Sequence, residues 1–265
     1  MDQILEDAAE NAAIEEAPAR QLNEAEEARI KSLMEIGAFY GLSKSRTNPK
    51  MRPYIIATRS GAEVIDLEKT VEALDKAAEV LKAKARSGGT ILFVGTTPAA
   101  KNAVKSLADE LQMPYVTERW LGGTLTNFRV ISQRISQLRK LKEDQEGGRL
   151  EKYTKKERFG IMKELERLDK FFHGLFYLDR MPTAAFIVDL KNNTLAAREA
   201  RKAGIAVIAT VNTNANPDLA DYAVPVNDKS VQVIDNVIEV IGRAVKEGRK
   251  EFESAAKQEE VKNEQ

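Results

Sequence analysis

Three runs of residues that are apolar almost throughout constrain the fold of this 265-residue chain more than any other feature. They cover residues 91–94, 184–188 and 205–211, and each precedes a stretch with helical periodicity or a turn that opens one. A strand that is apolar on both faces belongs in a sheet covered on both sides, and strands that alternate with helices favour parallel connections. The runs therefore predict the buried core of a parallel α/β sheet.

Weaker patterns complete the expected sheet. Residues 114–117 and 222–226 add two shorter strands, which makes a flavodoxin-like, doubly wound parallel sheet the expected fold. Asp66 is the expected N-cap of the helix before the first run, and Thr97 that of the helix after it, with Pro98 at its first position. Further elements are expected as helices over about 22–36, 193–203 and 230–247, and as a strand pair over 54–58 and 63–66.

A charged segment, residues 127–180, separates the second expected strand of the sheet from the third. Its apolar residues form two seams with coiled-coil spacing, over 131–141 and 161–175, and a Gly-Gly pair lies between them. The segment is therefore expected to be an inserted antiparallel coiled-coil hairpin. A helix of about 20 residues would carry its tip about 30 Å beyond the sheet.

Composition restricts the chemistry and the cellular location that can be expected of this chain. The chain has no cysteine, which excludes disulfides and thiolate metal sites. No apolar run is long enough to span a bilayer and the N-terminus has no secretory signal, so a cytoplasmic protein is expected. The expected parts are an acidic flexible extension (1–20), an α/β domain (21–126 and 181–248), the arm (127–180) and a charged flexible tail (249–265).

Catalytic equipment is sparse in this sequence. The turn over residues 95–98 could bind phosphate at a helix start, but no phosphate-loop or dinucleotide motif is present, and helix capping explains the turn equally well. His173 is the single histidine and falls in the arm, which disfavours a catalytic triad or a zinc site. Asp189, Asp218 and Asp221 could hold a hard cation, although caps and turns also account for them. No enzyme, metal or cofactor is predicted.

Charge is segregated although the chain as a whole is neutral. Residues 1–27 carry nine acidic side chains against Arg20 alone, whereas residues 127–180 hold 14 Lys and Arg against 9 Asp and Glu. Basic side chains interleaved with aromatic ones suit contacts with RNA phosphates and bases, although charged coiled-coil surfaces look similar. The candidate RNA contacts are Lys50 and Arg52 before the first strand pair, Arg134, Arg139 and Lys140 on the first arm helix, and Arg149, Lys152, Tyr153, Lys155, Lys156 and Arg158 at the tip.

A tryptophan-glycine motif over residues 118–128 marks the point where the domain gives way to the arm. Glycine pairs permit positive φ and close backbone approach, so a rigid corner with a packed tryptophan is expected here. The residues assigned to this structural motif are Trp120, Gly122, Gly123, Thr124 and Asn127.

The same motif, Arg-Trp-Leu-Gly-Gly-x-Leu-Thr-Asn-Phe over residues 119–128, resembles the signature of the bacterial small-subunit ribosomal protein number two family. Further matches lie at 48–51, 66–70, 91–96, 150–157, 165–168 and 212–218, in the family's order. The resemblance implies a flavin-free flavodoxin-like domain and a coiled-coil arm without catalysis. It also implies binding of small-subunit ribosomal RNA and recruitment of the large RNA-binding ribosomal protein number one, and it adds Arg119 to the candidate contacts.

One departure from the family pattern lies near the start of the chain. The family has Gly-x-His-Phe-Gly-His where residues 37–42 read Gly-Ala-Phe-Tyr-Gly-Leu, so no role of those histidines transfers. Two hypotheses follow from the sequence. The first is a structural ribosomal protein that binds ribosomal RNA and neighbouring ribosomal proteins. The second is a nucleotide or small-molecule binder, centred on residues 95–97.

Overall fold

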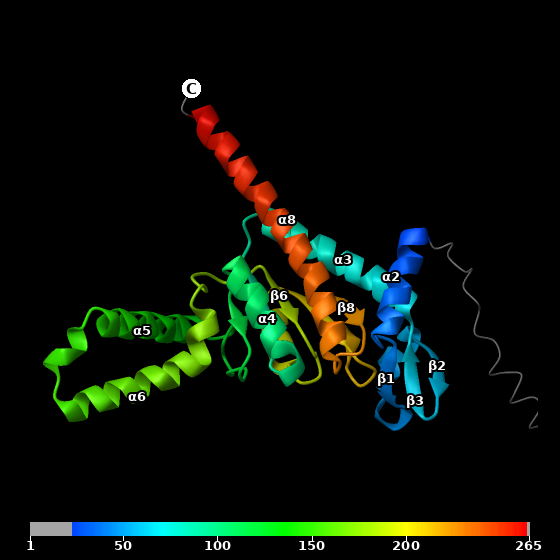
Figure 1. The fold of residues 1–265 in the computed structure, drawn as a ribbon, viewed down its shortest axis with the longest axis horizontal. Helices are drawn as coiled ribbons and strands as arrows, with labels where there is room; N and C mark the ends of the chain where they lie inside the picture. Colours follow the sequence, from blue (N-terminus) through cyan, green and yellow to red (C-terminus); the bar gives the residue numbers. More distant parts are fainter. Residues whose placement is uncertain (1–22, 264–265) are drawn as a thin grey trace, which may run out of the picture.

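The computed structural model describes residues 23–263 (Figure 1). The apolar runs form the middle strands of one parallel sheet in it. The strand order is β5-β4-β6-β7-β8, all neighbours being parallel. Renumbered from the first strand, this is the 2-1-3-4-5 order of the flavodoxin-like fold, so the predicted sheet is confirmed. The strands are β4 (Ile91–Val94), β5 (Tyr115–Val116), β6 (Ala184–Ile187), β7 (Ala206–Val211) and β8 (Tyr222–Pro225).

The two faces of this sheet pack against different elements. Phe93 and Phe186, whose ring centroids lie 6.1 Å apart, belong to one core cluster with α3 (Leu67–Arg86), α4 (Pro98–Leu111) and α8 (Val231–Asn263). Leu92 and Ile187 belong to a second cluster with α7 (Thr194–Lys202) and the base of the arm. Because strand residues alternate between faces, one sheet serves both cores.

A smaller antiparallel sheet precedes the parallel one. The expected strand pair is confirmed as β2 (Ile55–Arg59) and β3 (Ala62–Ile65), and β1 (Tyr40–Ser43), which the sequence did not predict, pairs with β3 on its other side. The remaining short elements around it are α2 (Glu24–Glu35), capped by Asn23, and the 3₁₀ turns η1 (Lys44–Arg46) and η2 (Pro49–Tyr54).

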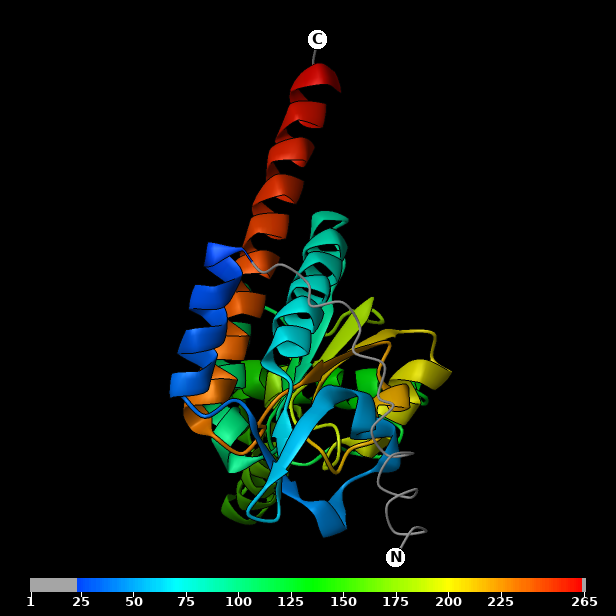
Figure 2. The ribbon, with the colours of Figure 1, turned by 90° about the vertical axis from the view of Figure 1, so that its right-hand side faces the viewer.

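The closing helix is longer than expected. We expected a helix over about 230–247 that frays after Lys246, but α8 continues to Asn263 and passes along α3 (Figure 2). Gly248 does not end it, because this glycine lies against α3: a Cβ there would stand 2.3 Å from the backbone oxygen of Lys82. Lys82 also pairs with Glu247 and Glu251 at 3.0 and 3.1 Å. Close contact between the two helices therefore carries α8 past the expected end. The expected extension over residues 1–20 lies outside the described residues.

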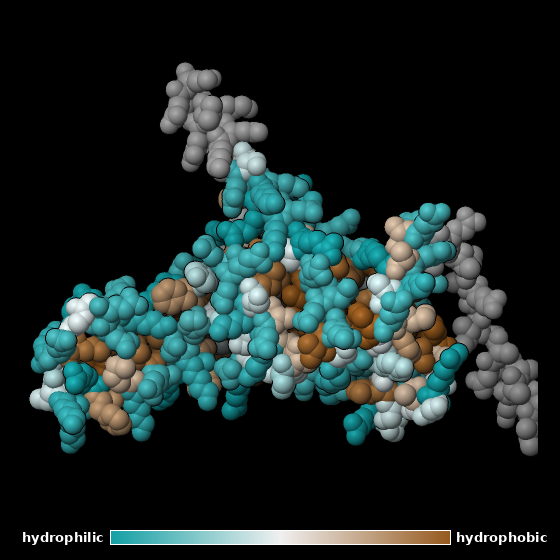
Figure 3. Space-filling model, viewed as in Figure 1, coloured by the Kyte–Doolittle hydropathy of each residue, from teal (hydrophilic) through white to brown (hydrophobic). Residues whose placement is uncertain are grey.

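The inserted segment forms two antiparallel helices joined at a tip. They are α5 (Phe128–Glu146) and α6 (Lys155–Phe172), with η3 (Arg149–Lys152) between them and η4 (His173–Leu175) leading back to the domain. Gly148 takes a left-handed φ of +67°, and Thr154 and Glu157 form a capping box that begins α6. Figure 3 shows apolar residues between hydrophilic outer surfaces of the hairpin.

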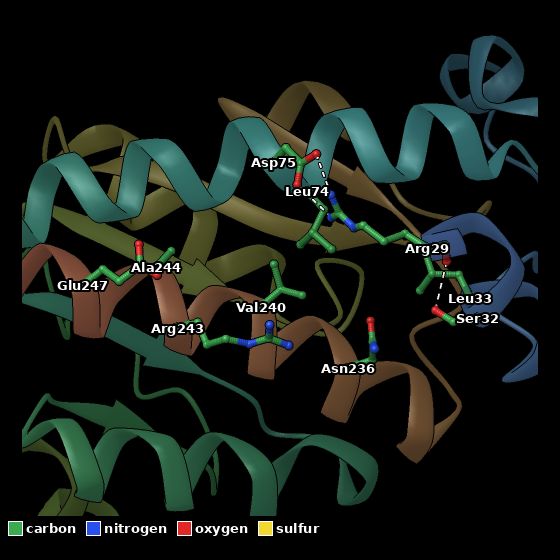
Figure 4. Close-up of a pocket in the computed structure, with 10 residues that line it drawn as sticks. All are labelled: Arg29, Ser32, Leu33, Leu74, Asp75, Asn236, Val240, Arg243, Ala244 and Glu247. Carbon is green, nitrogen blue, oxygen red and sulfur yellow. Dashed lines mark hydrogen bonds and ion pairs between the residues drawn. The ribbon is translucent and has the colours of Figure 1, made fainter. Parts of the chain in front are cut away.

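A groove of about 470 Å³ runs between α2, α3 and α8 (Figure 4). Arg29 of α2 crosses one end and makes two hydrogen bonds of 2.8 and 2.7 Å to the carboxylate of Asp75 in α3. Leu33 and Leu74 line the groove beside this pair. The pair and the apolar lining tie the N-terminal helix to the face of the sheet opposite α7.

Candidate nucleic-acid interface and the clamp that positions the arm

The tryptophan-glycine motif closes around a single buried carboxylate. Glu199 of α7, only 6% exposed, accepts hydrogen bonds on one oxygen from the Trp120 indole Nε1 at 3.1 Å and the Gly123 amide at 2.8 Å. Its other oxygen accepts from the amides of Leu125 and Thr126, at 3.1 and 3.4 Å, and from the Thr126 hydroxyl at 3.3 Å. One carboxylate thus holds the loop that leads into α5, and we call this arrangement the clamp.

Charge is retained on Glu199 despite its burial. Burial by itself raises the pKa of this carboxyl, but the hydrogen bonds from Gly123, Trp120, Leu125 and Thr126 together outweigh it and lower the pKa below its ordinary value. The ionised form is therefore the one that the loop binds. A buried carboxylate with five donors is a rigid anchor rather than a general acid.

The local sequence explains how the clamp forms. The buried side of α7 carries Ala196, Ala197 and Ala200, whose small side chains let the helix lie close to the sheet and the loop. Glu199 falls on this same apolar side. Sequence reasoning missed it, although a carboxylate within a stripe of alanines was the available signal.

The corner itself agrees with the expectation only in part. Trp120 and Thr124 are buried, and Gly123 takes a φ of +90°, as expected of a packed corner. Gly122 is exposed, with no atom within 4 Å of the position that a Cβ would take, and nothing in the structure explains why glycine stands there. Asn127 is the N-cap of α5 by position, but its side chain makes no capping hydrogen bond.

A flavodoxin-like fold binds ligands at the carboxyl ends of its strands. In this chain, its own side chains occupy that position. Thr96 donates to Asn193 at 2.9 Å across the gap between β4 and β6, the topological switch point. Thr97 stands at the N-cap position of α4, but its hydroxyl makes no capping bond, contrary to the expectation. This filled edge disfavours a ligand centred on residues 95–97.

The three aspartates considered as cation ligands have partners within the protein. Lys229 lies 2.5 Å from Asp189 and 3.4 Å from Asp228. Asp218 pairs with Lys50, and Asp221 accepts a hydrogen bond from the Val207 amide at 2.8 Å. Over residues 23–263, no three His, Cys, Asp or Glu side chains are grouped as metal ligands would be.

The candidate RNA contacts fall into four places. Lys50 and Arg52 lie exposed on η2, and Arg119 lies exposed just before the clamped loop. On α5, Arg134 bonds Gln137 at 3.0 Å and Lys140 is exposed. The tip holds the rest: Arg149, Lys152, Tyr153, Lys155, Lys156 and Arg158, all exposed.

Arg139 has a different environment from the other candidates. Its guanidinium lies 5.0 Å from the centre of the Phe176 ring and donates to Asp179 at 2.7 Å and to the Phe176 carbonyl. The side chain thus links α5 to the segment that leaves α6. These contacts give Arg139 a place in the base of the arm, whereas its neighbour Lys140 faces solvent.

The tip brings charge and an aromatic ring together. Lys152 lies over the Tyr153 ring at 5.3 Å, and Arg149 pairs with Asp144 at 2.7 Å. Lys155, Lys156 and Arg158 make no ion pair with any residue that the structure describes. Since α5 has 19 residues, this cluster lies about 28 Å along the arm from the clamp.

Comparison with known proteins adds to this geometry. The family model for ribosomal protein S2 matches residues 33–248. The small ribosomal subunit protein uS2 of Coprothermobacter proteolyticus is 43% identical over 220 residues, covering 83% of this chain and 82% of that protein. The chain belongs to the ribosomal protein S2 family. The uS2 protein of Thermus thermophilus is also 43% identical, over 212 residues that cover 80% of this chain and 83% of that protein.

Membership of the ribosomal protein S2 family confirms the resemblance drawn from residues 119–128 and a structural, non-enzymatic role in the small ribosomal subunit. The matched span includes the arm and the clamp, both within residues 33–248. Among the helices over residues 23–263, none combines the length and apolarity that crossing a membrane requires.

Proposed function

We propose that this chain binds small-subunit ribosomal RNA through its basic arm and domain surface and contacts neighbouring ribosomal proteins, as a structural constituent of the cytoplasmic ribosome. The main observation in support of this proposal is the cationic tip, which two helices hold at a distance from the sheet. The two relatives compared above are named as small ribosomal subunit proteins. The large RNA-binding ribosomal protein number one is included among the proposed partners.

The position of the tip cations supports an anionic partner. Lys155, Lys156 and Arg158 lie in the first turn of α6, where the helix dipole is positive. Each cation placed there costs about 0.3–1 kcal/mol rather than stabilising the helix. Their presence is better explained by phosphates that they contact than by the stability of the arm. Tyr153, 41% exposed, adds a ring on which a base can stack.

We also propose that the two seams pack as a coiled coil near the domain. Ile131, Ile135 and Leu138 of α5 are buried in one cluster with Leu165 and Leu168 of α6, at the spacing that the sequence predicts. Leu141 and Ile161, farther out, line an open cleft of about 430 Å³. The arm is then firm at its base and less tightly packed toward its tip.

This packing decides which deletion tests the function. Removing residues 129–180 would expose the sheet face that the base of the arm covers, so loss of binding could reflect unfolding. Replacing only residues 142–161 with a short Gly-Ser loop removes most of the distal arm and keeps the buried seam. We expect this variant to stay folded and to lose RNA affinity and salt sensitivity in filter-binding assays.

Sedimentation with small subunits provides the second readout. The intact chain should co-sediment with them, and Lys155→Gln/Lys156→Gln should do so less at raised salt because phosphate contacts depend on counterion release. Arg167→Gln/Lys163→Gln, on the same helix but away from the tip, is the matched control. RNA binding by the distal deletion that is unchanged in strength and insensitive to salt would rule out the proposed role of the arm.

A further inference from the structure

The exposed charges of the last two turns of α7 are all basic. Arg198, Arg201 and Lys202 are spaced three and four residues apart, so they share one side of the helix, and Lys191 lies in the turn that precedes it. All four side chains are exposed. We call these four residues the α7 face. None of them was among the candidate RNA contacts drawn from the sequence.

No exposed acid within the helix balances this charge. Glu199 is the single carboxylate of residues 191–202, and it is buried, with its charge held by the clamp. Charged surfaces normally mix both signs, as the arm does. A helix whose only acid is turned inward therefore presents a purely cationic side to solvent.

Neighbouring elements leave this charge unbalanced. Arg201 donates to the backbone oxygen of Asp218 in η5 (Pro217–Leu219), and the Asp218 carboxylate pairs with Lys50 of η2. Arg119 immediately precedes Trp120, whose indole bonds Glu199 on α7. The α7 face thus lies between two positions already considered for RNA, and the acid that adjoins it, Asp218, is neutralised by one of them.

From this arrangement we propose that the α7 face binds the phosphate backbone of RNA, and that Glu199, buried in the same helix, holds the arm in a fixed relation to that RNA. The inference rests on the proposed RNA-binding function and assigns it a surface on the domain. A cluster of exposed cations suits phosphate contacts, which position rather than specify. One short helix then joins the two RNA-binding parts of the chain.

The test compares three pairs of charge-removing substitutions by filter binding to small-subunit ribosomal RNA transcribed in vitro, over a series of KCl concentrations. Arg198→Gln/Lys202→Gln removes two cations of the α7 face and spares Arg201, whose side chain contacts η5. Lys31→Gln/Lys250→Gln removes two exposed cations from α2 and α8, on the other side of the sheet. Lys155→Gln/Lys156→Gln removes two from the tip.

For the α7 variant we expect affinity about tenfold lower near physiological salt, and a salt-dependence slope smaller by about 1.5 because two phosphate contacts are lost. The α2–α8 control should stay within about twofold of wild type under the same conditions. Each variant should unfold at the same temperature as wild type. This control shows that a change in affinity reflects lost RNA contacts and not lost folding.

Three outcomes would overturn the inference. If the α7 variant binds as wild type while the tip variant is weakened, the α7 face has no RNA role and the proposed function stands. If wild type itself does not bind this RNA, the proposed function fails with it. If wild type binds polyglutamate more tightly than the α7 variant does while the two bind RNA equally, the face is a site for an acidic polypeptide instead.

Discussion

A single side chain, Glu199, links the domain to the loop that leads into the arm. Five donors from the loop converge on its two oxygens, and three of them are backbone amides. A buried donor left without an acceptor costs about 1–3 kcal/mol. The clamp is therefore a stabilising contact that fixes the loop leading into α5.

Replacing Glu199 by Gln should lower the free energy of unfolding by about 2–3 kcal/mol at pH 7, because the amide loses the charge and half of the acceptor capacity. Trp120→Phe removes only one donor and should cost less. The pKa of Glu199 is lowered on folding, so its contribution is present above the unfolded pKa and is lost as pH falls through the folded value. Urea unfolding should show the gap between wild type and Glu199→Gln narrowing below about pH 4.5. A gap that widens on acidification would contradict the ionised clamp.

Asp228 responds to pH in the opposite direction. Burial and the charge of Asp189 raise its pKa to about 6, although Lys229 and Asn212 oppose the rise. The folded state therefore binds this proton more tightly than the unfolded chain, and stability falls as pH rises from about 4 to about 6. Asp228→Asn keeps an acceptor for Asn212 and removes this loss. Between pH 4 and pH 8, the unfolding free energy of the variant relative to wild type should therefore rise by about 2–3 kcal/mol. Equal differences at both pH values in urea unfolding would show that the charge of Asp228 does not oppose folding.

Arg139 and Lys140 are adjacent on α5, but substituting them should affect stability and RNA affinity differently. Arg139→Gln removes the stacking on Phe176 and the bond to Asp179, so it should destabilise the protein by about 1–2 kcal/mol. Lys140→Gln changes an exposed cation and should alter stability by less than about 0.5 kcal/mol while lowering RNA affinity. Urea unfolding and filter binding on the two variants separate these effects. Equal loss of stability in both would mean that Arg139 is not a structural link.

At the scale of the elements, those with a strong local pattern could be predicted. The sheet followed from apolar runs at 91–94, 184–188 and 205–211, and the arm helices from seam spacing and the Gly-Gly turn. The expected end of α8 was wrong because the residues after Lys246 are charged and weakly apolar, whereas Gly248 lets this part of the helix touch α3. Strand β1 was missed because its four residues lack alternation and form a strand only by pairing with β3.

Site residues were harder to predict for the same reason. Basic side chains at the tip are visible in any charge count, but the meaning of Glu199 depends on a loop 73 to 79 residues away in the chain. The α7 face likewise looks like an ordinary charged helix until burial shows that its one acid points inward. Charge patterns become informative only when the fold has separated the buried charges from the exposed ones.

The molecule as a whole is neutral, yet its charges are divided between regions that would act on RNA in opposite ways. Residues 1–22 carry six acidic side chains against Arg20, a net charge of −5, whereas the arm and the α7 face are cationic. At low ionic strength, where screening extends over about 30 Å at 0.01 M, such acids oppose the approach of a polyanion even without touching it.

Deleting residues 1–22 should therefore raise affinity for small-subunit ribosomal RNA by about three- to tenfold at about 0.03 M salt, with the difference shrinking toward about 0.3 M as charges are screened. A chain of full length in which the six acids are replaced by Asn and Gln is the matched control, because it changes charge without changing length. Both variants should bind alike if repulsion is the cause. A gain that persists at high salt, or one confined to the deletion, would instead indicate that this segment covers an RNA-binding surface directly.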